Sequence, residues 1–373
     1  MRDDRPGRHL VVSAVNFSEG GPLTILRDSL AAASAVLGPQ WRITALVHDH
    51  GLIDDPRVQT IAFPQSKRSW FRRIALEWRG FLPLSRRLEP DLWLSLHDIT
   101  PRIEARRQAV YCHNPAPFYS PNLTELRFDP RFILFNKLYY ALYRALIGHN
   151  HAVIVQQSWL RDAFRPLHRN VVVAHPGADA DAPAIDQGVS LRHATPDAPL
   201  RLLYPALPRV FKNIETVCEA LAALPDAHRG LVELRLTMTG TENRWARELT
   251  RRYGATPGIR FIGRQDRERM AAEYAACDMV LFPSRLETWG LPISEAKLFG
   301  KPLLVADLPY ARETVGTYAG VNFLDPRDSA AWTAAMAEVA AGRWAPDGQV
   351  RDDPDAPFFS DWPSLWSYLV EGL

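Results

Sequence analysis

The sequence predicts an α/β protein with two Rossmann-like, doubly wound parallel sheets, and three observations support this. Short apolar runs alternate with helical patterns, which is typical of a parallel sheet with helices on both faces. This alternation occurs twice, on either side of an aperiodic stretch rich in Ala, Asp, Pro and Thr. The chain has 373 residues, more than one hydrophobic core usually supports. We therefore expect domains at 1–178 and 200–355, a linker at 179–199 and a terminal helix at 356–373.

The expected elements follow the hydrophobic pattern. In the first half, strands are expected at 9–15, 41–47, 91–96, 109–112, 152–155 and 170–174, and helices at 22–37 and 132–147. In the second half, strands are expected at 201–204, 232–239, 259–262, 279–282 and 302–305, and helices at 214–224, 242–253, 267–276, 293–299 and 330–341. Ligands of such sheets bind beyond the carboxyl ends of the strands. Gly240, Gly263, Ser284 and Asp307 end strands of the second half and place a site there.

Composition and charge leave a soluble globular enzyme or binding protein as the expectation. Apolar residues make up 47% and charged residues 23% of the chain, and the net charge of +2 argues neither for nor against nucleic acid. Cys112, Cys218 and Cys277 are widely spaced in apolar contexts, which fits a reducing compartment. The first residues lack the apolar core of a signal peptide, and no apolar run reaches the ~18 residues of a membrane span. A cytoplasmic location is predicted unless the chain adheres to a membrane surface.

Two acids near a predicted helix start are the most informative feature. Glu287 and Glu295 are eight residues apart and flank Gly290-Leu291-Pro292, directly after the apolar run 279–282. This order predicts a strand, an acid-bearing loop and a helix N-terminus, whose N–H groups and dipole suit a phosphate. A single Glu in a first helical turn is ordinary, because it complements the dipole. The pair together favours a ligand site in which one acid binds sugar hydroxyls and the other binds ribose hydroxyls.

The stretch 283–302 resembles the Glu-x7-Glu signature of the retaining glycosyltransferases with the GT-B fold, the GT-4-type (group 1) family. The resemblance extends to Ile259-Arg-Phe-Ile-Gly263, Tyr274-Ala-Ala-Cys-Asp278 and 309–316. It implies two Rossmann-like domains facing across a cleft, with the segment 356–373 crossing back onto the first. It also implies transfer of a hexose from a nucleotide-diphosphate sugar, with retention, without a metal and without a further cofactor. No residue stands out as a general base, in agreement with front-face transfer assisted by the leaving phosphate.

The resemblance also implies roles for single residues. Glu287 would hold donor-sugar hydroxyls, and Glu295 would hold the ribose. Lys212, Arg209 and His113 would join Glu287 as catalytic residues. The remaining donor-binding residues are expected at Gly20, Gly21, Gly263, Ser284, Thr288, Trp289, Gly290 and Leu291.

Lys212 and Arg209 are the basic residues expected to bind the leaving diphosphate, and only Lys212 stands at a position that the family pattern shares. A leaving diphosphate needs positive charge, which Arg supplies as a bidentate donor and Lys as a point charge. The family commonly has an Arg five residues before the Lys, whereas here Leu207 occupies that position and Arg209 lies three before Lys212. Solvated surface charge is the competing interpretation of Arg209.

In the first half, Gly20-Gly21 follows the first strand, where a tight turn is the simpler interpretation. The family places such a loop against the donor phosphates. His113 ends a strand that faces the expected cleft and resembles the family histidine near the reacting carbon, although a lone His is often structural. Ser158, after Gln157, is expected to cap a helix.

Two acidic motifs are not expected to bind a metal. Asp179-Ala180-Asp181 opens the linker rather than a strand-end loop, and metal sites need convergent ligands. His97-Asp98 has no partner at ligand spacing. We therefore expect no metal site.

The segment 67–87 contains seven Lys or Arg residues and one Glu. Its aromatic and apolar residues recur at helical spacing, which is the pattern of an interfacial helix on anionic lipid. A packed helix whose arginines face water is the alternative, and no nucleic-acid module accompanies the charge, so no nucleic acid is expected as a partner. The expected membrane contacts are Lys67, Arg68, Trp70, Arg72, Arg73, Trp78 and Arg79.

These features together predict a peripheral enzyme on the inner face of the cytoplasmic membrane. The expected acceptor is a growing, lipid-linked surface polysaccharide such as O-antigen or capsule. A mannose- or deoxyhexose-type donor on GDP, dTDP or UDP is favoured. The sugar stays open because the common Glu-Gly-Phe-Gly is here Glu-Thr-Trp-Gly, and Lys297-Leu298-Phe299 replaces small residues. The alternatives are a glycosyltransferase for a small soluble metabolite, a GT-B nucleotide-sugar epimerase and a non-catalytic sugar-nucleotide-binding subunit; the oligomeric state is not predicted.

Overall fold

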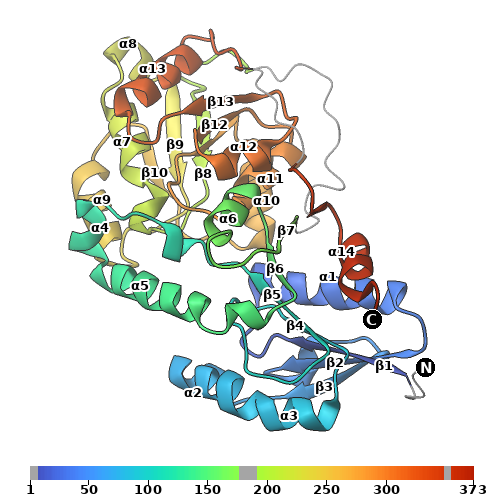
Figure 1. Ribbon diagram of the computed structural model, residues 1–373. Helices are drawn as coiled ribbons and strands as arrows, with labels where there is room; N and C mark the ends of the chain where they lie inside the picture. Colours follow the sequence, from blue (N-terminus) through green and yellow to red (C-terminus); the bar gives the residue numbers. More distant parts are fainter. Residues whose placement is uncertain (1–6, 176–190, 348–353) are drawn as a thin grey trace. The chain divides into compact units, whose positions relative to one another are not determined.

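The computed structural model describes residues 7–175, 191–347 and 354–373, which form two compact α/β units (Figure 1). Unit 1 comprises Met1–Phe118, Asn136–Gly177 and Pro354–Leu373, and unit 2 comprises Tyr119–Phe135 and Ala178–Asp353. Each unit is built on one parallel sheet. The predicted α/β class with two parallel sheets is therefore confirmed. The acidic motif at 179–181 and most of the expected linker lie outside the described residues.

The sheet of unit 1 has eight strands in the order β14-β7-β6-β5-β4-β1-β2-β3, all of them parallel. The strands are β1 (Arg8–Ser13), β2 (Trp41–Val47), β3 (Val58–Ala62), β4 (Leu92–Ser95), β5 (Arg107–Cys112), β6 (Ala152–Val155), β7 (Val171–Ala174) and β14 (Phe358–Phe359). The two strands at the edges of the sheet, β3 and β14, are the ones that the hydrophobic pattern did not predict.

Helices cover both faces of this sheet. They are α1 (Gly20–Val36), α2 (Trp70–Ala75), the π-helical turn η3 (Leu76–Gly80), α3 (Phe81–Leu88), α6 (Ser158–Phe164) and α14 (Trp362–Val370), with short 3₁₀ turns η1 (His50–Leu52), η2 (Ser66–Arg68), η4 (Ala116–Phe118) and η5 (Ile147–His149). Alternate side chains of β1 point to opposite faces: Leu10 packs with residues of α1 and α14, and Val11 packs with Phe81 of α3. Both faces of the sheet are thereby buried, as expected of a parallel sheet.

The C-terminal segment belongs to unit 1. β14 pairs in parallel with β7, and α14 lies beside α1 (Figure 1). The indole Nε1 of Trp366 donates a hydrogen bond of 2.8 Å to the carbonyl of Ser29 in α1. The segment expected to be a helix over 356–373 thus contains a short strand followed by a helix.

The sheet of unit 2 has six parallel strands in the order β10-β9-β8-β11-β12-β13. The strands are β8 (Leu200–Tyr204), β9 (Val232–Leu236), β10 (Ile259–Phe261), β11 (Met279–Phe282), β12 (Leu303–Ala306) and β13 (Val321–Leu324). The helices are α4 (Leu123–Phe128), α7 (Ile214–Ala222), α8 (Asp226–Arg229), α9 (Arg244–Tyr253), α10 (Arg267–Ala276), α11 (Leu291–Leu298), α12 (Pro309–Val315) and α13 (Ser329–Ala340), with a 3₁₀ turn η6 (Val210–Lys212).

Both sheets reverse their strand order at one point. In unit 2 the order runs outward from β8 to β10 on one side and from β11 to β13 on the other; in unit 1 the reversal falls between β1 and β4. Such a reversal opens a crevice at the carboxyl ends of the two central strands, where doubly wound sheets bind their ligands. The fold therefore points to the loops after β8 and β11, and after β1 and β4.

The segment 119–135, which the sequence analysis places in the N-terminal domain, packs on unit 2. Its aromatic side chains explain this, because Phe128 lies 4.8 Å from Trp245 and Phe132 stacks at 5.3 Å on Phe211, between ring centroids. Helix α5 (Pro130–Arg144) starts in this segment and continues into unit 1. The order of residues along the chain gave no sign of this exchange.

The basic segment 67–88 is helical, but part of it packs inward. Trp70 and Trp78 are half-buried against an apolar cluster of unit 1, as in the packed-helix alternative. Arg73 is buried, and its Nε donates at 2.7 Å to the fully buried carboxylate of Glu77. Its expected role as a membrane contact is therefore wrong, because an arginine held by a buried acid cannot reach a lipid surface.

Two smaller expectations are also tested. Across the described residues, no helix combines the length and the apolar character that crossing a bilayer requires. Helix α6 is preceded by Gln157 as its N-cap residue, without a side-chain capping bond. The expected capping role of Ser158 is therefore wrong, because Ser158 is already the first helical residue.

Candidate functional site

The loops after β8 and β11 bring Lys212 and Glu287 together. The two strands are neighbours in the sheet of unit 2, so their carboxyl ends meet at the point of reversal. The Nζ of Lys212 forms a short ion pair with Oε1 of Glu287. The two side chains are 18% and 14% exposed, so the pair is largely desolvated yet still reachable. Two residues that lie 75 positions apart in the sequence thus form one charged centre.

Hydrogen bonds from two buried tyrosine hydroxyls fix the backbone of both loops. The hydroxyl of Tyr204 donates to the carbonyl of Lys212, and that of Tyr310 donates at 2.7 Å to the carbonyl of Ser284. Burial, followed by the negative charge of Glu287, raises the pKa of both tyrosines well above the ordinary value. Both hydroxyls therefore stay protonated and remain donors, which holds the charged pair in place.

Aromatic rings surround the ammonium group of Lys212. Its Nζ lies 5.9 Å from the ring centroid of Phe211 and 5.6 Å from that of Phe282. These rings exclude water from one side of the cation while their faces attract it. A positive charge held in this way interacts more strongly with an incoming anion than a fully solvated lysine does.

The N-terminus of α11 opens beside this pair. Gly290 precedes the helix with φ +90°, a left-handed conformation that other residues rarely adopt. A Cβ atom there would lie 3.3 Å from Phe282 and 3.4 Å from Tyr310, so it would fit closely against both rings. Leu291 follows as the first helical residue and is 47% exposed, Pro292 has no N–H, and the N–H of Ile293 donates at 2.8 Å to the carbonyl of Gly290.

Three expected donor residues around this turn have different surroundings. The side chain of Trp289 is buried and donates from Nε1 at 2.9 Å to Oγ of Ser294, so it supports the loop from within. Ser284 is fully buried and its hydroxyl donates at 3.3 Å to the carbonyl of Leu286. Thr288 is half-buried. Of the three, Ser284 and Trp289 can offer a ligand their backbone rather than their side chains.

Glu295 lies in the first turns of α11 and accepts a hydrogen bond of 2.6 Å from the hydroxyl of Tyr274. Burial raises its pKa, and the bond from Tyr274 opposes that rise. Tyr274 therefore helps to keep the carboxylate ionised, the form that accepts hydrogen bonds from hydroxyl groups.

Arg209 and Gly263 occupy separate positions in unit 2. Arg209 precedes η6, its side chain is 51% exposed, and its Nη1 lies 3.4 Å from Oδ2 of Asp129. Gly263 follows β10, two strands away from β8, and its N–H donates at 3.1 Å to the carbonyl of Met238. The carbonyl of Arg209 accepts a bond of 3.0 Å from the N–H of Lys212, while its guanidinium group points to Asp129 rather than to Glu287.

Gly20, Gly21 and His113 lie at the carboxyl edge of the sheet in unit 1. The two glycines open α1 after β1 and are exposed, and His113 follows β5. Nε2 of His113 donates at 2.7 Å to the carbonyl of Leu96, since that oxygen can only accept. Burial lowers the pKa of His113, so its ring is neutral at pH 7. Nδ1 of the ring is then an acceptor.

Asp98 organises the loops around His113. Its carboxylate accepts bonds from the N–H of His113 at 2.5 Å and from the hydroxyls of Tyr139 at 2.9 Å and Tyr143 at 3.1 Å. In these contacts the carboxylate serves as an anchor for the surrounding loops. In the part of the chain that the structure describes, no three His, Cys, Asp or Glu side chains gather as a metal site.

Sequence reasoning missed Arg285, which stands two residues before Glu287. Its Nη2 lies 3.2 Å from Oε1 of the buried Glu125 and 3.6 Å from Oε1 of Glu215, whose side chain is 15% exposed. Burial raises the pKa of Glu215 to about 7, against the opposing effect of Arg285. The only signal in the sequence was the position of Arg285 inside the run 283–302.

Arg285 also lines a pocket of about 370 Å³ at the carboxyl ends of β11, β12 and β13. The pocket carries both signs of charge and several hydrogen-bonding groups. It is lined by Tyr119, Ser120, Asn122, Arg285, Asp307, Leu308, Asp325, Pro326 and Arg327. Three of these residues come from the segment 119–135, whose exchange between units the sequence did not reveal.

Comparison with known proteins assigns this region to a family. Residues 194–347 match the family described as glycosyl transferases group 1. A glycogen synthase of Mycobacterium tuberculosis is 30% identical over 142 residues, which are 38% of this chain and 34% of that protein. A D-inositol 3-phosphate glycosyltransferase of Corynebacterium kroppenstedtii is 28% identical over 183 residues, 46% of this chain and 40% of that protein. The chain thus spans less than half the length of these curated relatives.

Solved structures extend the likeness to both units. WaaG, a glycosyltransferase involved in lipopolysaccharide biosynthesis, superimposes with a TM-score of 0.61 at 15% identity, covering 97% of this chain and 100% of that chain. Anabaena HepE in complex with UDP-glucose gives a TM-score of 0.54 at 15% identity, covering 90% and 93%. At such identities the likeness shows the fold alone. The chain therefore has the GT-B fold, and its residues 194–347 match the model of the glycosyl transferases group 1 family.

Proposed function

We propose that the chain transfers a hexose from a nucleotide-diphosphate sugar to an acceptor, with retention of configuration and without a metal ion. The observation that carries the proposal is the Lys212–Glu287 pair at the point of reversal of the unit 2 sheet. Next to it lies the glycine-capped N-terminus of α11. A lysine and a helix N-terminus side by side suit a diphosphate, and a carboxylate beside them suits sugar hydroxyls.

The roles follow from the contacts. The ammonium group of Lys212 stabilises the negative charge that develops on the leaving diphosphate, which is the main electrostatic task of the reaction. Glu287 binds hydroxyls of the donor sugar and orients Lys212. The N–H groups at Gly290 and Leu291 bind phosphate oxygens, and Glu295 binds the ribose hydroxyls.

The remaining predicted residues have secondary places in this proposal. Of the residues of unit 1, we assign His113 to the donor sugar as a neutral acceptor and Gly20-Gly21 to the phosphates. Gly263 lies by the base. Arg209 is assigned to the diphosphate with less support, since the structure pairs it with Asp129.

The donor class is supported by a structural neighbour, because HepE was solved with UDP-glucose. UDP, GDP and dTDP sugars are accordingly the first donors to examine. The replacement of the common Gly-Phe by Thr288-Trp289 places a bulkier and partly polar pair next to the sugar. Trp289 is buried, so Thr288 is the residue that we expect to alter the choice of sugar.

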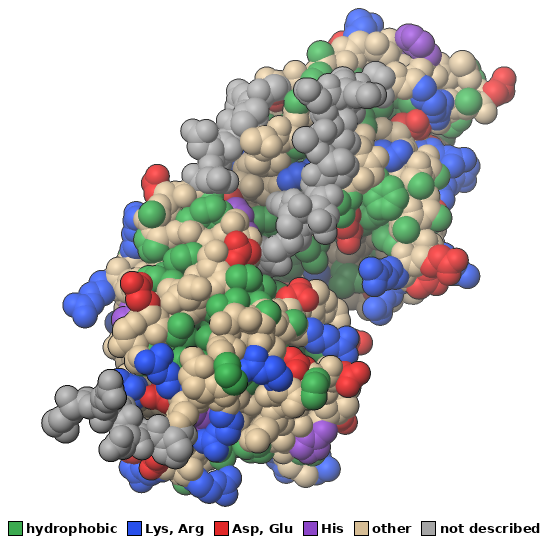
Figure 2. Space-filling view, turned by 90° about the vertical axis from the view of Figure 1, so that its right-hand side faces the viewer, with side chains coloured by type: hydrophobic (Ala, Val, Ile, Leu, Met, Phe, Trp, Pro, Cys, Tyr) green, Lys and Arg blue, Asp and Glu red, His purple; other side chains and the backbone are tan. Residues whose placement is uncertain are grey.

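For the acceptor we propose a lipid-linked surface polysaccharide, reached from the inner face of the cytoplasmic membrane. WaaG, which acts in lipopolysaccharide biosynthesis, supports this choice. On the face shown in Figure 2, basic and acidic side chains are interspersed. The segment 67–79 instead exposes Lys67, Arg68, Arg72 and Arg79 together with Phe71, which is 78% exposed. Basic side chains around an exposed aromatic ring suit an anionic lipid surface.

A second candidate is transfer to a small soluble acceptor. The similarity to a D-inositol 3-phosphate glycosyltransferase favours it. In that case vesicles would not bind the protein, and transfer would proceed with a free polyol or its phosphate.

A thermal-shift panel of GDP, UDP, dTDP and ADP sugars tests the proposal. A donor at about 100 times its dissociation constant adds roughly 2.7 kcal/mol of stability, which is easily measured. Transfer is then assayed with the donor that binds. Conversion of the donor without any acceptor would indicate an epimerase, and binding without turnover would indicate a sugar-nucleotide-binding subunit. Intact transfer in a Glu287→Ala variant would contradict the assigned site.

A further inference from the structure

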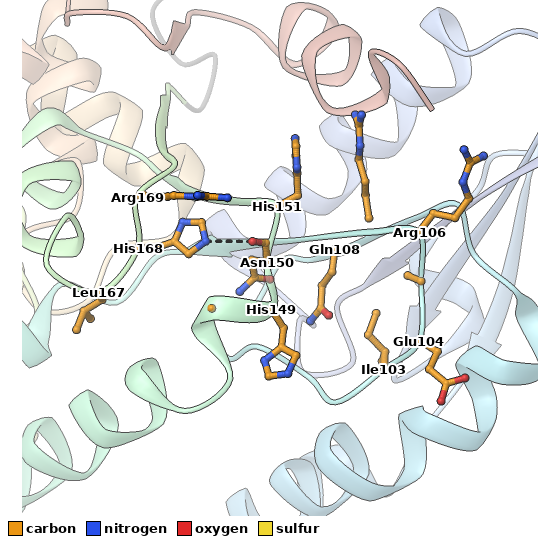
Figure 3. A pocket seen from close by; sticks show the side chains of 13 residues that line it. Ile103, Glu104, Arg106, Gln108, His149, Asn150, His151, Leu167, His168 and Arg169 are labelled. Atoms are coloured by element: carbon orange, nitrogen blue, oxygen red, sulfur yellow. Dashed lines mark hydrogen bonds between the residues drawn. The ribbon is translucent and has the colours of Figure 1, made fainter.

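Unit 1 contains a second pocket, of about 810 Å³, at the amino edge of its sheet (Figure 3). Three loops line it, and each leads into one of the neighbouring strands β5, β6 and β7. The loops cover residues 103–106, 148–151 and 167–169. The pocket therefore lies at the edge opposite to Gly20-Gly21 and His113, which follow the carboxyl ends of strands.

The wall of this pocket is positively charged. It carries the three arginines Arg106, Arg107 and Arg169 and one acid, Glu104. The loops 148–151 and 167–169 add the imidazole rings of His149, His151 and His168. Glu104 is paired with Arg86 at 2.7 Å, and Arg106 with Asp91 at 3.0 Å. Among the described residues, no carboxylate lies within ion-pair distance of Arg107 or Arg169. Two arginines thus contribute uncompensated positive charge.

The side chains of this wall extend to two sides of the strand edge. Figure 3 shows those of Arg106 and His151 extending to one side, and those of His149 and Glu104 to the other. Nη1 of Arg107 donates at 3.2 Å to the carbonyl of Leu369 and also to that of Glu371, which leaves its remaining N–H groups for a ligand.

Hydrogen bonds between the loops hold the wall rigidly. Nε2 of His168 bonds at 3.0 Å with the carbonyl of Asn150, drawn as a dashed line in Figure 3, and the amide of Asn170 donates at 2.7 Å to the carbonyl of His151. The side chain of Asn150 donates at 2.8 Å to Thr100. These bonds fix the loops that carry His151 and Arg169 before any ligand arrives, which lowers the entropic cost of binding.

The geometry points to a binding site for a phosphate-bearing anion, formed by Arg107, Arg169 and His151. Arginine suits phosphate because its planar group donates two parallel hydrogen bonds. Burial, then Arg107 and His168, lower the pKa of His151, so its ring is neutral at pH 7 and can donate one further N–H. The site belongs to unit 1 and does not depend on which sugar the proposed transferase uses.

Calorimetric titration of the whole chain with inorganic pyrophosphate tests this site. The titration is done in a Lys212→Ala background, so that the proposed donor site contributes little to the signal. We expect saturable binding, weakened roughly tenfold by Arg169→Gln and severalfold by His151→Asn, since each loses a hydrogen bond to a charged group. Arg165→Gln, an exposed arginine of unit 1 outside the pocket, is the matched control and should bind as the parent does.

Three results would overturn the inference. One is the absence of binding in the Lys212→Ala background when the unaltered chain binds, which would place all binding at the donor site. Another is equal weakening by Arg165→Gln, which would indicate nonspecific charge. The third is unchanged affinity in both pocket variants. Failure of donor binding in the thermal-shift panel with intact pyrophosphate binding here would contradict the proposed function but not this site.

Discussion

Lys212 and Glu287 form an ion pair that joins the loops after β8 and β11, the two strands between which the sheet of unit 2 reverses its order. The pair holds the two loops together, because each charged side chain fixes the position of the other, and both side chains remain partly exposed to solvent. In the proposed reaction it also has a chemical consequence, since a diphosphate bound by Lys212 would carry its sugar next to Glu287. The same two side chains therefore link the topology of the fold to the proposed reaction.

Replacing Lys212 by alanine should abolish most of the transfer activity without unfolding the chain. The loss of one preorganised positive group at a developing anion typically lowers kcat about 10²- to 10³-fold. Removing the ammonium group leaves the largely desolvated carboxylate of Glu287 without its partner, which should lower the melting temperature, while the backbone bond from Tyr204 remains and the chain stays folded. Steady-state kinetics and a melting curve on the same preparation check this.

Arg209→Ala is the matched control for that variant. Arg209 lies three residues earlier and is half-exposed, with its ion pair to Asp129 at the surface. Surface pairs contribute about 0–1 kcal/mol. We expect a smaller loss of activity than for Lys212→Ala; an equal or larger loss would make Arg209 the principal diphosphate ligand and overturn our ranking.

Gly290→Ala should lower the stability of unit 2 and weaken donor binding together. The residue has φ +90°, and a Cβ atom would press on Phe282, Ile293 and Tyr310. Left-handed backbone at a non-glycine residue costs about 1–3 kcal/mol. Gly230→Ala is the control, because a Cβ atom there meets no atom within 4 Å. Thermal unfolding that is equal for the two variants would show that the turn tolerates a side chain.

The sequence predicted the parts of the fold that depend on local pattern. The buried strands gave uninterrupted apolar runs, so β2, β6 and β11 have the predicted bounds. Glu287 and Glu295 were predicted to share a site because they flank one turn. The pairing of Lys212 with Glu287 followed only from strand order, which places β8 beside β11.

Features that depend on distant packing were not predictable. Helical spacing grouped Arg73 with its exposed neighbours, but burial of Glu77 turns Arg73 inward. Likewise, Phe128 and Phe132 draw their segment onto unit 2 through Trp245 and Phe211, which lie about a hundred positions later. No short-range signal marks such contacts. The edge strand β3 was missed because its side chains are half-buried and its pattern is weak.

Phe71→Ser combined with Arg72→Ser should reduce binding to anionic vesicles without lowering stability. Both side chains are exposed on α2, so they contribute little to the core. Removing an exposed aromatic ring and one charge should weaken partitioning roughly tenfold or more at low salt. Flotation with phosphatidylglycerol vesicles measures this, and Arg260→Ser, an exposed arginine of unit 2, serves as the control. No binding by the unaltered chain would favour the soluble acceptor.

Glu215→Gln should flatten the pH dependence of stability. The folded-state pKa of Glu215 is raised by burial from 4.5 to about 7, so the folded state holds a proton that the unfolded state releases. Stability therefore falls as pH rises from about 4.5 to about 7 and is constant above that. This fall in the free energy of unfolding, which Glu215→Gln should remove, is no more than about 3 kcal/mol. Denaturant titrations at several pH values measure the slope. Glu77 in unit 1 has the same shift for the same first cause, so part of the slope should remain.

Tyr274→Phe should make nucleotide binding more sensitive to acid. Burial raises the pKa of Glu295 and the hydroxyl of Tyr274 counteracts that rise, so removing the hydroxyl should raise the pKa of Glu295 further. A protonated Glu295 accepts hydrogen bonds from ribose hydroxyls less well. As the pH is lowered, the affinity for the nucleoside diphosphate should therefore begin to fall at a higher pH than in the unaltered chain, and at the lowest pH it should be weaker by up to about tenfold. Titrations of the nucleoside diphosphate between about pH 5 and about pH 8 measure the midpoint. Tyr318→Phe removes another buried tyrosine hydroxyl of unit 2, bonded to the carbonyl of Lys301, and should leave the midpoint unchanged. A midpoint that shifts equally in both variants would indicate general destabilisation, and one that shifts in neither would remove Glu295 from the ribose site.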